Sequence, residues 1–176
     1  EAKDAIRALH ACGISKVVMM TGDNRRTAAS VAEEVGVDEF YAEVLPEDKA
    51  AFIRREKAAD RTVIMIGDGV NDSPALSEAD AGVAISTGAA IAREIADITI
   101  ASEDLFELVT LRRISEALMG RIHRNYRFIV GFNLGLIVFG VAGLLPPTTS
   151  ALLHNASTLA ISLKSMTNLL PDKKKI

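Results

Sequence analysis

Residues 63–72 read Val-Ile-Met-Ile-Gly-Asp-Gly-Val-Asn-Asp. The apolar, β-branched start predicts a buried strand over residues 62–66, and the glycines that follow predict a loop. In open α/β sheets, ligands bind beyond the carboxyl ends of the strands. Two carboxylates there, Asp68 and Asp72, suit Mg²⁺, and Gly67 and Gly69 let the backbone approach a ligand closely. An Asx-type turn with both carboxylates in solvent is the structural alternative.

Helix and strand patterns alternate on both sides of this stretch. The alternation predicts an α/β fold with a Rossmann-like parallel sheet and helices on both faces. Glycines at helix ends and a proline at a helix start set several of the boundaries. We expect helices over residues 2–11, 25–35, 47–59, 74–79 and 89–95, and further strands over residues 17–20, 40–44, 82–85 and 97–100.

Two further stretches carry residues suited to phosphate chemistry. Thr21, Gly22 and Asp23 follow an expected strand, where a hydroxyl and the amides of the next helix could cradle phosphate. Lys49 stands near the start of a helix, where its ammonium could neutralise charge in phosphoryl transfer. Taken singly both signals are weak, because such a tripeptide occurs in ordinary loops and most lysines are solvated surface residues.

The charges divide the chain into two parts. Residues 1–104 hold 20 acidic and 11 basic residues, whereas residues 105–176 hold 3 acidic and 9 basic residues. The single cysteine, Cys12, rules out a disulfide framework and a cysteine-based metal cluster within the chain. The basic residues cluster at the ends of apolar segments, so they do not indicate a nucleic-acid partner.

Residues 128–163 contain no Asp, Glu, Lys or Arg. We expect an amphipathic connecting helix over 105–127 and a transmembrane hairpin over 128–170, with spans at about 128–145 and 148–170 separated by two prolines. The basic flanks would place residues 1–127 and the tail, 171–176, in the cytoplasm. A buried core helix is the alternative for the first span.

Polar residues of the second span are the candidates for a transport site. Ionisable residues inside a membrane are costly and usually functional, and imidazole and oxygen donors bind transition metals. The alternative is that these side chains only hydrogen-bond to neighbouring helices. For Lys164, one interpretation is that its side chain extends to the lipid headgroups. The other is that its ammonium serves as a counter-ion for a metal site after the metal has left. The residues are His154, Asn155, Ser157 and Lys164.

The order of these motifs resembles the haloacid dehalogenase-like phosphotransferases and, more narrowly, the phosphorylation domain and last two membrane helices of heavy-metal-transporting P-type ATPases. The resemblance implies that Thr21 and Gly22 bind the transferred phosphoryl group and that Lys49 stabilises its charge. Asp23 would orient its loop or meet the ribose of a nucleotide. Asn71 would bind the phosphate, and Asp68 and Asp72 would hold Mg²⁺.

The family's phosphorylated aspartate lies in an Asp-Lys-Thr-Gly-Thr motif that this sequence does not contain. The resemblance therefore implies a C-terminal fragment of a pump, inactive alone, with residues 1–104 as part of its phosphorylation domain. The intact protein would use ATP and Mg²⁺, lie in a bacterial-type plasma membrane, and export zinc, cobalt or manganese ahead of copper. Its partners would be the lipid bilayer and the remainder of the pump. A P-type ATPase for potassium or protons, a soluble phosphatase and a tethered non-catalytic regulator are the alternatives.

Overall fold

The computed structural model describes residues 2–68, 70–85, 94–100 and 104–169. The chain divides into two compact units, Glu1–Thr110 and Leu111–Ile176. The boundary lies six residues beyond the expected one at residue 104, because the first turns of the long helix α6 belong to the first unit. Its residues Leu108 and Val109 are 7% and 3% exposed.

The strands of the first unit are all parallel, as the sequence predicts, but they form two separate sheets. In the first sheet Val18 lies opposite Glu39, and in the second Ile64 lies opposite Ala81. Parallel strands need crossover connections, which the helices supply. The sheets are β1 (Val18–Met20) with β2 (Glu39–Tyr41), and β3 (Ile64–Gly67) with β4 (Ala81–Ile85) and β5 (Ile98–Ile100).

The helices of this unit begin and end close to the expected positions. α1 and α2 match the predicted ranges, because their boundaries are written in local sequence. Asn24 caps α2 by accepting a hydrogen bond from the Thr27 amide at 3.0 Å, and Gly36 closes it with a φ of 77°. The expected helix over 89–95 lies largely outside the described residues. The helices are α1 (Ala2–Ala11), α2 (Arg25–Val35), α3 (Pro46–Ala58) and α4 (Ser73–Glu78), with a 3₁₀ turn η1 (Val70–Asp72).

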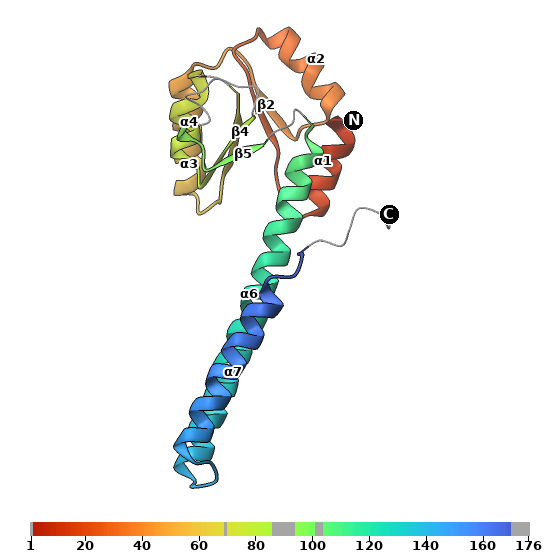
Figure 1. Cartoon of the computed structure of the whole chain (residues 1–176). Coiled ribbons are helices and arrows are strands. Elements are labelled where there is room, and N and C mark those ends of the chain that lie inside the picture. Colours follow the sequence, from red (N-terminus) through yellow and green to blue (C-terminus); the bar gives the residue numbers. More distant parts are fainter. Residues whose placement is uncertain (1, 69, 86–93, 101–103, 170–176) are drawn as a thin grey trace. The chain divides into compact units, whose positions relative to one another are not determined.

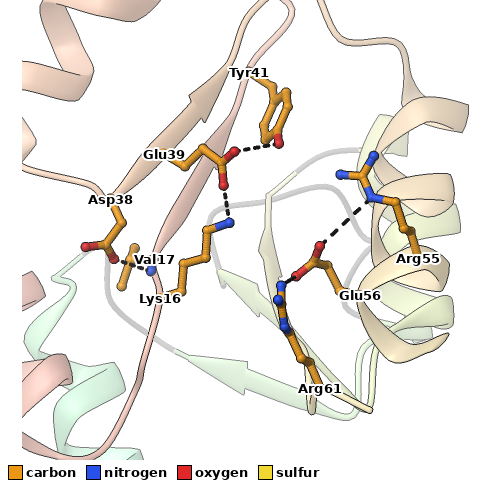
Figure 2. Close-up of polar contacts among 8 residues, drawn as sticks. All are labelled: Lys16, Val17, Asp38, Glu39, Tyr41, Arg55, Glu56 and Arg61. Carbon is orange, nitrogen blue, oxygen red and sulfur yellow. Dashed lines mark hydrogen bonds and ion pairs between the residues drawn. The ribbon is translucent and has the colours of Figure 1, made fainter. Parts of the chain in front are cut away.

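Three aspartates set the register of neighbouring strands by one repeated contact. Each stands directly before its strand and accepts the backbone N–H near the start of the adjacent strand. Asp38 Oδ2 lies 2.6 Å from the Val17 nitrogen, a contact that Figure 2 shows. Asp80 Oδ2 accepts from the Val63 amide at 2.8 Å, and Asp97 Oδ2 accepts from the Gly82 amide at 2.8 Å.

The core of the second sheet forms where α4 packs on β4. Leu76 and Ala84 are 1% and 0% exposed, and Met65 and Ala96 pack against them. A Cβ on Gly82 would lie 2.7 Å from the Leu76 carbonyl oxygen. Any side chain there would push the helix from the strand, so Gly82 permits this close packing. α3 in turn packs beside α4 (Figure 1).

Charged and aromatic side chains gather around Glu39 of β2 (Figure 2), and Tyr41 of the same strand contacts α3. Lys16 forms an ion pair with Glu39, and the Tyr41 hydroxyl donates to Glu39 Oε1 at 2.8 Å. The hydrogen bond from Lys16, and then the one from Tyr41, lower the pKa of Glu39. The hydrogen bond to Glu39 in turn raises the pKa of Lys16. The Tyr41 ring meets Phe52 of α3 edge-on, with centroids 5.2 Å apart.

The second unit is a hairpin of α6 (Phe106–Val141) and α7 (Pro147–Ser165), which lie side by side in Figure 1. The expected connecting helix over 105–127 and the first span are thus one continuous helix. α6 ends at Val141, four residues before the predicted end at 145. There Gly143 has a φ of 74°, and the Leu144 amide donates to the Phe139 carbonyl at 2.9 Å. These features form a Schellman-type helix end.

α7 also ends early, at Ser165 instead of the predicted residue 170. It begins one residue before the expected position, at Pro147, because the fixed φ of proline is tolerated in the first turn of a helix. Over the part of the chain that the structure describes, none of the helices has both the length and the apolar character needed to cross a membrane.

Candidate functional site

The loop after β1 is held in place by backbone hydrogen bonds from the segment after β2. The Thr21 amide donates to the Tyr41 carbonyl, and the Val44 amide donates to the Thr21 carbonyl, both at 3.0 Å. The Glu43 amide donates to the Asp23 carbonyl at 2.9 Å, and Glu43 itself has a left-handed φ of 56°. The loop that carries Thr21 is therefore fixed to the segment that leads into α3.

Within this loop, Asp23 orients the side chain of Thr21. The Thr21 hydroxyl donates to Asp23 Oδ2 at 2.9 Å, and its oxygen accepts the Asp23 amide at 3.1 Å. Gly22 is exposed, and the nearest atom to a Cβ built there is 3.9 Å away.

Lys49 and Asp72 form an ion pair between α3 and η1. Lys49 Nζ lies 2.7 Å from Asp72 Oδ1, and the two side chains are 15% and 12% exposed. Asp48 fixes the start of α3 by accepting the Leu45 amide at 3.2 Å. Because the pair is largely removed from water, each charge depends on the other for compensation.

Gly67 is required by the position of Asp72. A Cβ on Gly67 would lie 2.6 Å from the Asp72 Cβ and 2.8 Å from its Oδ2. The sequence assigned Gly67 to the close approach of a ligand, whereas here the carboxylate side chain of Asp72 occupies that space. Gly69, the second glycine of the expected pair, lies outside the described residues.

Asp68 directly follows β3 and is exposed, as is Asn71. Among the described residues, no group of three or more His, Cys, Asp or Glu side chains comes together as a ready-made metal site. The donors nevertheless fit Mg²⁺, which binds through one or two carboxylates and keeps water or phosphate oxygens as its other ligands. Asp68 offers an accessible carboxylate, while Asp72 has one oxygen engaged by Lys49.

In the second unit, the structure joins His154 of α7 to a residue that the sequence analysis did not select. His154 Nδ1 lies 2.8 Å from Oδ1 of Asn133 on α6. Because a carbonyl oxygen can only accept, Nδ1 is the donor in this contact, and Nε2 is the ring nitrogen that Asn133 does not engage. The available signal was that Asn133 is the one strongly polar residue of the stretch 128–145.

The other transport-site candidates differ in their surroundings. The hydroxyls of Ser157 and Thr158 both donate to the His154 carbonyl, at 2.8 and 3.0 Å. Asn155 and Lys164 are exposed. The structure thus brings Asn133 of α6 to the His154 imidazole and Ser157 of α7 to the His154 carbonyl. Within the described part of the chain, it shows no side-chain hydrogen bond for Lys164.

Known proteins resemble this chain in sequence and in fold. Residues 1–80 match the family model of the haloacid dehalogenase-like hydrolases. The first unit has the haloacid dehalogenase-like fold. A solved zinc-transporting PIB-type ATPase in the E2.Pi state is 32% identical with a TM-score of 0.87, covering 93% of this chain and 26% of that one.

Curated relatives extend the similarity through the second unit. The manganese-exporting P-type ATPase of Mycobacterium tuberculosis is 41% identical over 92% of this chain and 23% of its own length. The copper-exporting P-type ATPase of Staphylococcus saprophyticus is 48% identical over 81% of this chain and 18% of its own length. The chain is thus homologous to heavy-metal P-type ATPases, and spans about one fifth of the length of these relatives.

Proposed function

We propose that this chain is part of an ATP-driven efflux pump for transition-metal ions. In this proposal the first unit belongs to the phosphorylation domain, and the second unit supplies the last two helices of the transport domain. The observation that carries the proposal is the Lys49–Asp72 pair, which joins the lysine helix to the acidic loop beyond β3. The homology to metal-exporting P-type ATPases along most of the chain supports it.

The residues around the Lys49–Asp72 pair would each bind a different part of the phosphoryl group. The Thr21 hydroxyl, oriented by Asp23, and the exposed Gly22 backbone would bind its oxygens. Lys49 is held by Asp72 at a fixed position, so its ammonium would not need to reorganise as charge develops. Asn71 would donate a further hydrogen bond from its amide.

Mg²⁺ would neutralise charge on the phosphate oxygens and help to align them. Asp68 would hold the ion directly. Asp72 would contribute mainly by fixing Lys49, with its Oδ2, which faces Gly67, as the atom still open to the magnesium shell. This proposal gives the two carboxylates different roles, whereas the sequence expectation was that both Asp68 and Asp72 would hold Mg²⁺.

The remainder of the pump would complete the sheet. Within the described residues β1 pairs only with β2, and β3 pairs only with β4 and not with β1. Ile64 and Ile66 of β3 are 45% and 37% exposed, which is unusual for the apolar residues of a parallel strand. A further parallel strand bearing the phosphorylated aspartate would join the two sheets and deliver that residue beside Thr21 and Asp68.

The second unit would lie in the membrane, against lipid and the earlier helices of the pump. Large apolar side chains cover the outside of the hairpin, which monomeric soluble proteins rarely tolerate over such an area. Residues 1–127 and the C-terminal tail would be cytoplasmic. The exposed apolar residues include Leu134, Ile137, Val138, Phe139, Leu152, Leu159 and Leu163.

The transported metal would bind near His154. The contact with Asn133 leaves Nε2 of the imidazole as the ligand atom, and Ser157 and Asn155 offer oxygens. A set of one imidazole and neutral oxygens, without thioether or thiolate, suits zinc, cobalt or manganese better than Cu(I). ATP would be bound by the remainder of the protein.

The test uses the full-length protein in lipid vesicles. We expect ATP hydrolysis stimulated by zinc, cobalt or manganese, with a phosphoenzyme labelled from ATP. The 176-residue chain alone should show neither autophosphorylation nor hydrolysis of a simple phosphate ester. Acid-stable label on Asp68 or Asp72 of the isolated chain would contradict the fragment assignment. Stimulation of the full-length protein by potassium alone would instead favour another ion specificity.

A further inference from the structure

Arg121 of α6 binds the end of α7 through three backbone carbonyls. Its guanidinium donates to the Ser165 carbonyl at 2.9 Å, to the Thr167 carbonyl at 2.6 Å and to the Asn168 carbonyl at 3.0 Å. The carbonyls at a helix C-terminus have no donors within the helix, and they carry the negative end of its dipole. Ser165 is the last residue of α7, and Thr167 and Asn168 follow the helix. One side chain thus binds a carbonyl at the helix end and two just beyond it, and supplies the complementary charge.

Asn125 strengthens this attachment from the next turn of α6. Its Nδ2 donates to the Ser165 hydroxyl oxygen at 2.9 Å. Residues four apart share one face of a helix, so Arg121 and Asn125 reach α7 from the same side. Ser165 is therefore held through both its backbone and its side chain. We call Arg121, Asn125 and Ser165 the end clamp.

The end clamp has a consequence for His154 and Asn133, which meet further along the hairpin. A helix rises 1.5 Å and turns about 100° per residue. Arg121 precedes Asn133 by about 18 Å of helix, and Ser165 follows His154 by about 16 Å, so both contacts belong to one antiparallel register. If α7 slipped by one residue against α6, His154 would rotate away from Asn133 and their 2.8 Å contact would be lost.

The apolar residues between the two contacts do little to prevent such a slip. Much of their surface is exposed and contacts between aliphatic side chains are not directional, whereas the fork of a guanidinium is rigid. A Cβ on Gly131 or Gly135 of α6 would meet nothing within 4 Å, so no side chain of α7 packs against these two positions. The directional contacts that fix the register are therefore concentrated at Arg121 and Asn125.

We propose that Arg121 is a positioning residue for metal binding, which acts by fixing the register of α7 so that His154 faces Asn133. Arg121 does not touch the metal. The proposal rests on the proposed function, because it assumes that His154 binds the transported ion. It predicts that loss of Arg121 weakens metal binding, even though Arg121 lies about three helical turns along α6 from Asn133, the residue that contacts His154.

The experiment measures metal-stimulated ATP hydrolysis by the full-length pump in vesicles. Arg121→Gln should raise the metal concentration for half-maximal stimulation about tenfold, a typical effect within one hydrogen-bond network. The KM for ATP should stay within about twofold, because the nucleotide site is elsewhere. Arg121→Lys keeps the charge but loses the forked guanidinium, so its metal concentration for half-maximal stimulation should lie between those of wild type and Arg121→Gln. Asn125→Ala should shift the metal concentration about threefold, and serves if Arg121→Gln fails to fold.

Arg124 provides the matched control. It lies on the same helix, is exposed, and has no hydrogen bond to another residue of the described part of the chain. Arg124→Gln removes the same charge and should leave the metal dependence unchanged. Equal curves for the Arg121 and Arg124 variants, with a metal-stimulated wild type, would overturn the role of Arg121 alone. A wild type that no transition metal stimulates would overturn the proposed function and this inference together.

A double-mutant cycle separates positioning from general support. If Arg121 acts through the His154–Asn133 contact, then Arg121→Gln should add little to the effect of Asn133→Ala on the metal dependence. Full additivity of the two substitutions would contradict the proposal, since it would mean that Arg121 affects metal binding by a separate route.

Discussion

The ammonium of Lys49 and the carboxylate of Asp72 lie 2.7 Å apart, and neither side chain is more than 15% exposed. Lys49 stands in the first turn of α3, whereas Asp72 ends the 3₁₀ turn that follows β3. The pair thus connects two helical elements that approach from different parts of the chain, at the carboxyl end of a parallel strand. A charge pair in such a place combines structural support with a position suited to anion binding.

Removing one member of this pair should cost more than removing both. Lys49→Met should lower the free energy of unfolding by about 2–4 kcal/mol, because it leaves the Asp72 charge buried and uncompensated. Asp72→Asn in the same chain should restore part of this loss, with a coupling energy of about 1–3 kcal/mol in a double-mutant cycle. Urea unfolding of the 176-residue chain in detergent, followed by circular dichroism, measures both.

Lys57 supplies the control for this cycle. Its ammonium lies 3.3 Å from Asp80 Oδ1, and both side chains are more than one third exposed. Lys57→Met should therefore cost less than about 1 kcal/mol. If the two lysine variants lose equal free energy of unfolding, burial of the Lys49–Asp72 pair does not make the loss of its lysine more costly.

Of the two described glycines of the candidate site, Gly67 should be less able than Gly22 to accept a side chain. Gly67→Ala places a Cβ 2.6 Å from the Asp72 Cβ, so β3 or the Asp72 side chain must move. We expect a loss of about 1–3 kcal/mol in stability. Gly22→Ala is the comparison, because its Cβ has no neighbour closer than 3.9 Å. A thermal melt in which both variants unfold at the same temperature would contradict the assignment.

The sequence predicted best those elements whose boundaries are encoded locally. α2 was predicted to the residue because Asn24 caps its start and Gly36 ends it. No helix boundary falls at residue 127, where the sequence was expected to divide into a connecting helix and a first span, and the reason is physical. Composition changes there from basic to apolar, which marks a change of environment, but no helix-breaking residue accompanies it, so α6 continues to Val141.

Pairings between distant residues could not be read from the sequence. Lys49 and Asp72 are 23 positions apart, and Asn133 and His154 are 21 positions apart. The residue types suggested anion and metal chemistry, but which side chains meet depends on strand register and helix rotation. The role of Gly67 was likewise hidden, because it depends on where the Asp72 side chain turns.

Asp80 should make the stability of the first unit depend on acid pH. The Val63 backbone N–H, and then Lys57, hold the pKa of Asp80 below its usual value. A carboxyl with a lowered folded-state pKa stabilises the fold above its unfolded pKa of about 3.9, and this contribution disappears as pH falls through the folded pKa. Asp80→Ala should therefore be less stable than wild type at pH 7.

The difference between the two proteins should shrink steadily below about pH 4. Unfolding curves at a series of pH values measure it. A gap between wild type and Asp80→Ala that stays constant from pH 7 to pH 3 would contradict the link to Asp80 ionisation.

Lys164 follows the stretch without charged residues, and its side chain has two expected roles: extension to the lipid headgroups, or a counter-ion for the metal site. It is exposed on the last turn of α7, which fits a side chain that reaches toward headgroups. If Lys164 instead acts as a counter-ion after metal release, Lys164→Met should slow the conformational step by which the metal-free pump returns to its metal-binding state. Turnover at saturating metal should then fall about fivefold, while the metal concentration for half-maximal stimulation changes little.

Lys164→Arg distinguishes charge from shape, because it keeps the cation and should retain most of the turnover. The measurements are metal-dependent ATP hydrolysis and metal transport by full-length protein in vesicles. If both rates are unchanged in Lys164→Met, the counter-ion role is wrong and the side chain only anchors the helix end. If Lys164→Arg fails as severely as Lys164→Met, the shape of the lysine matters and its charge alone does not explain the loss.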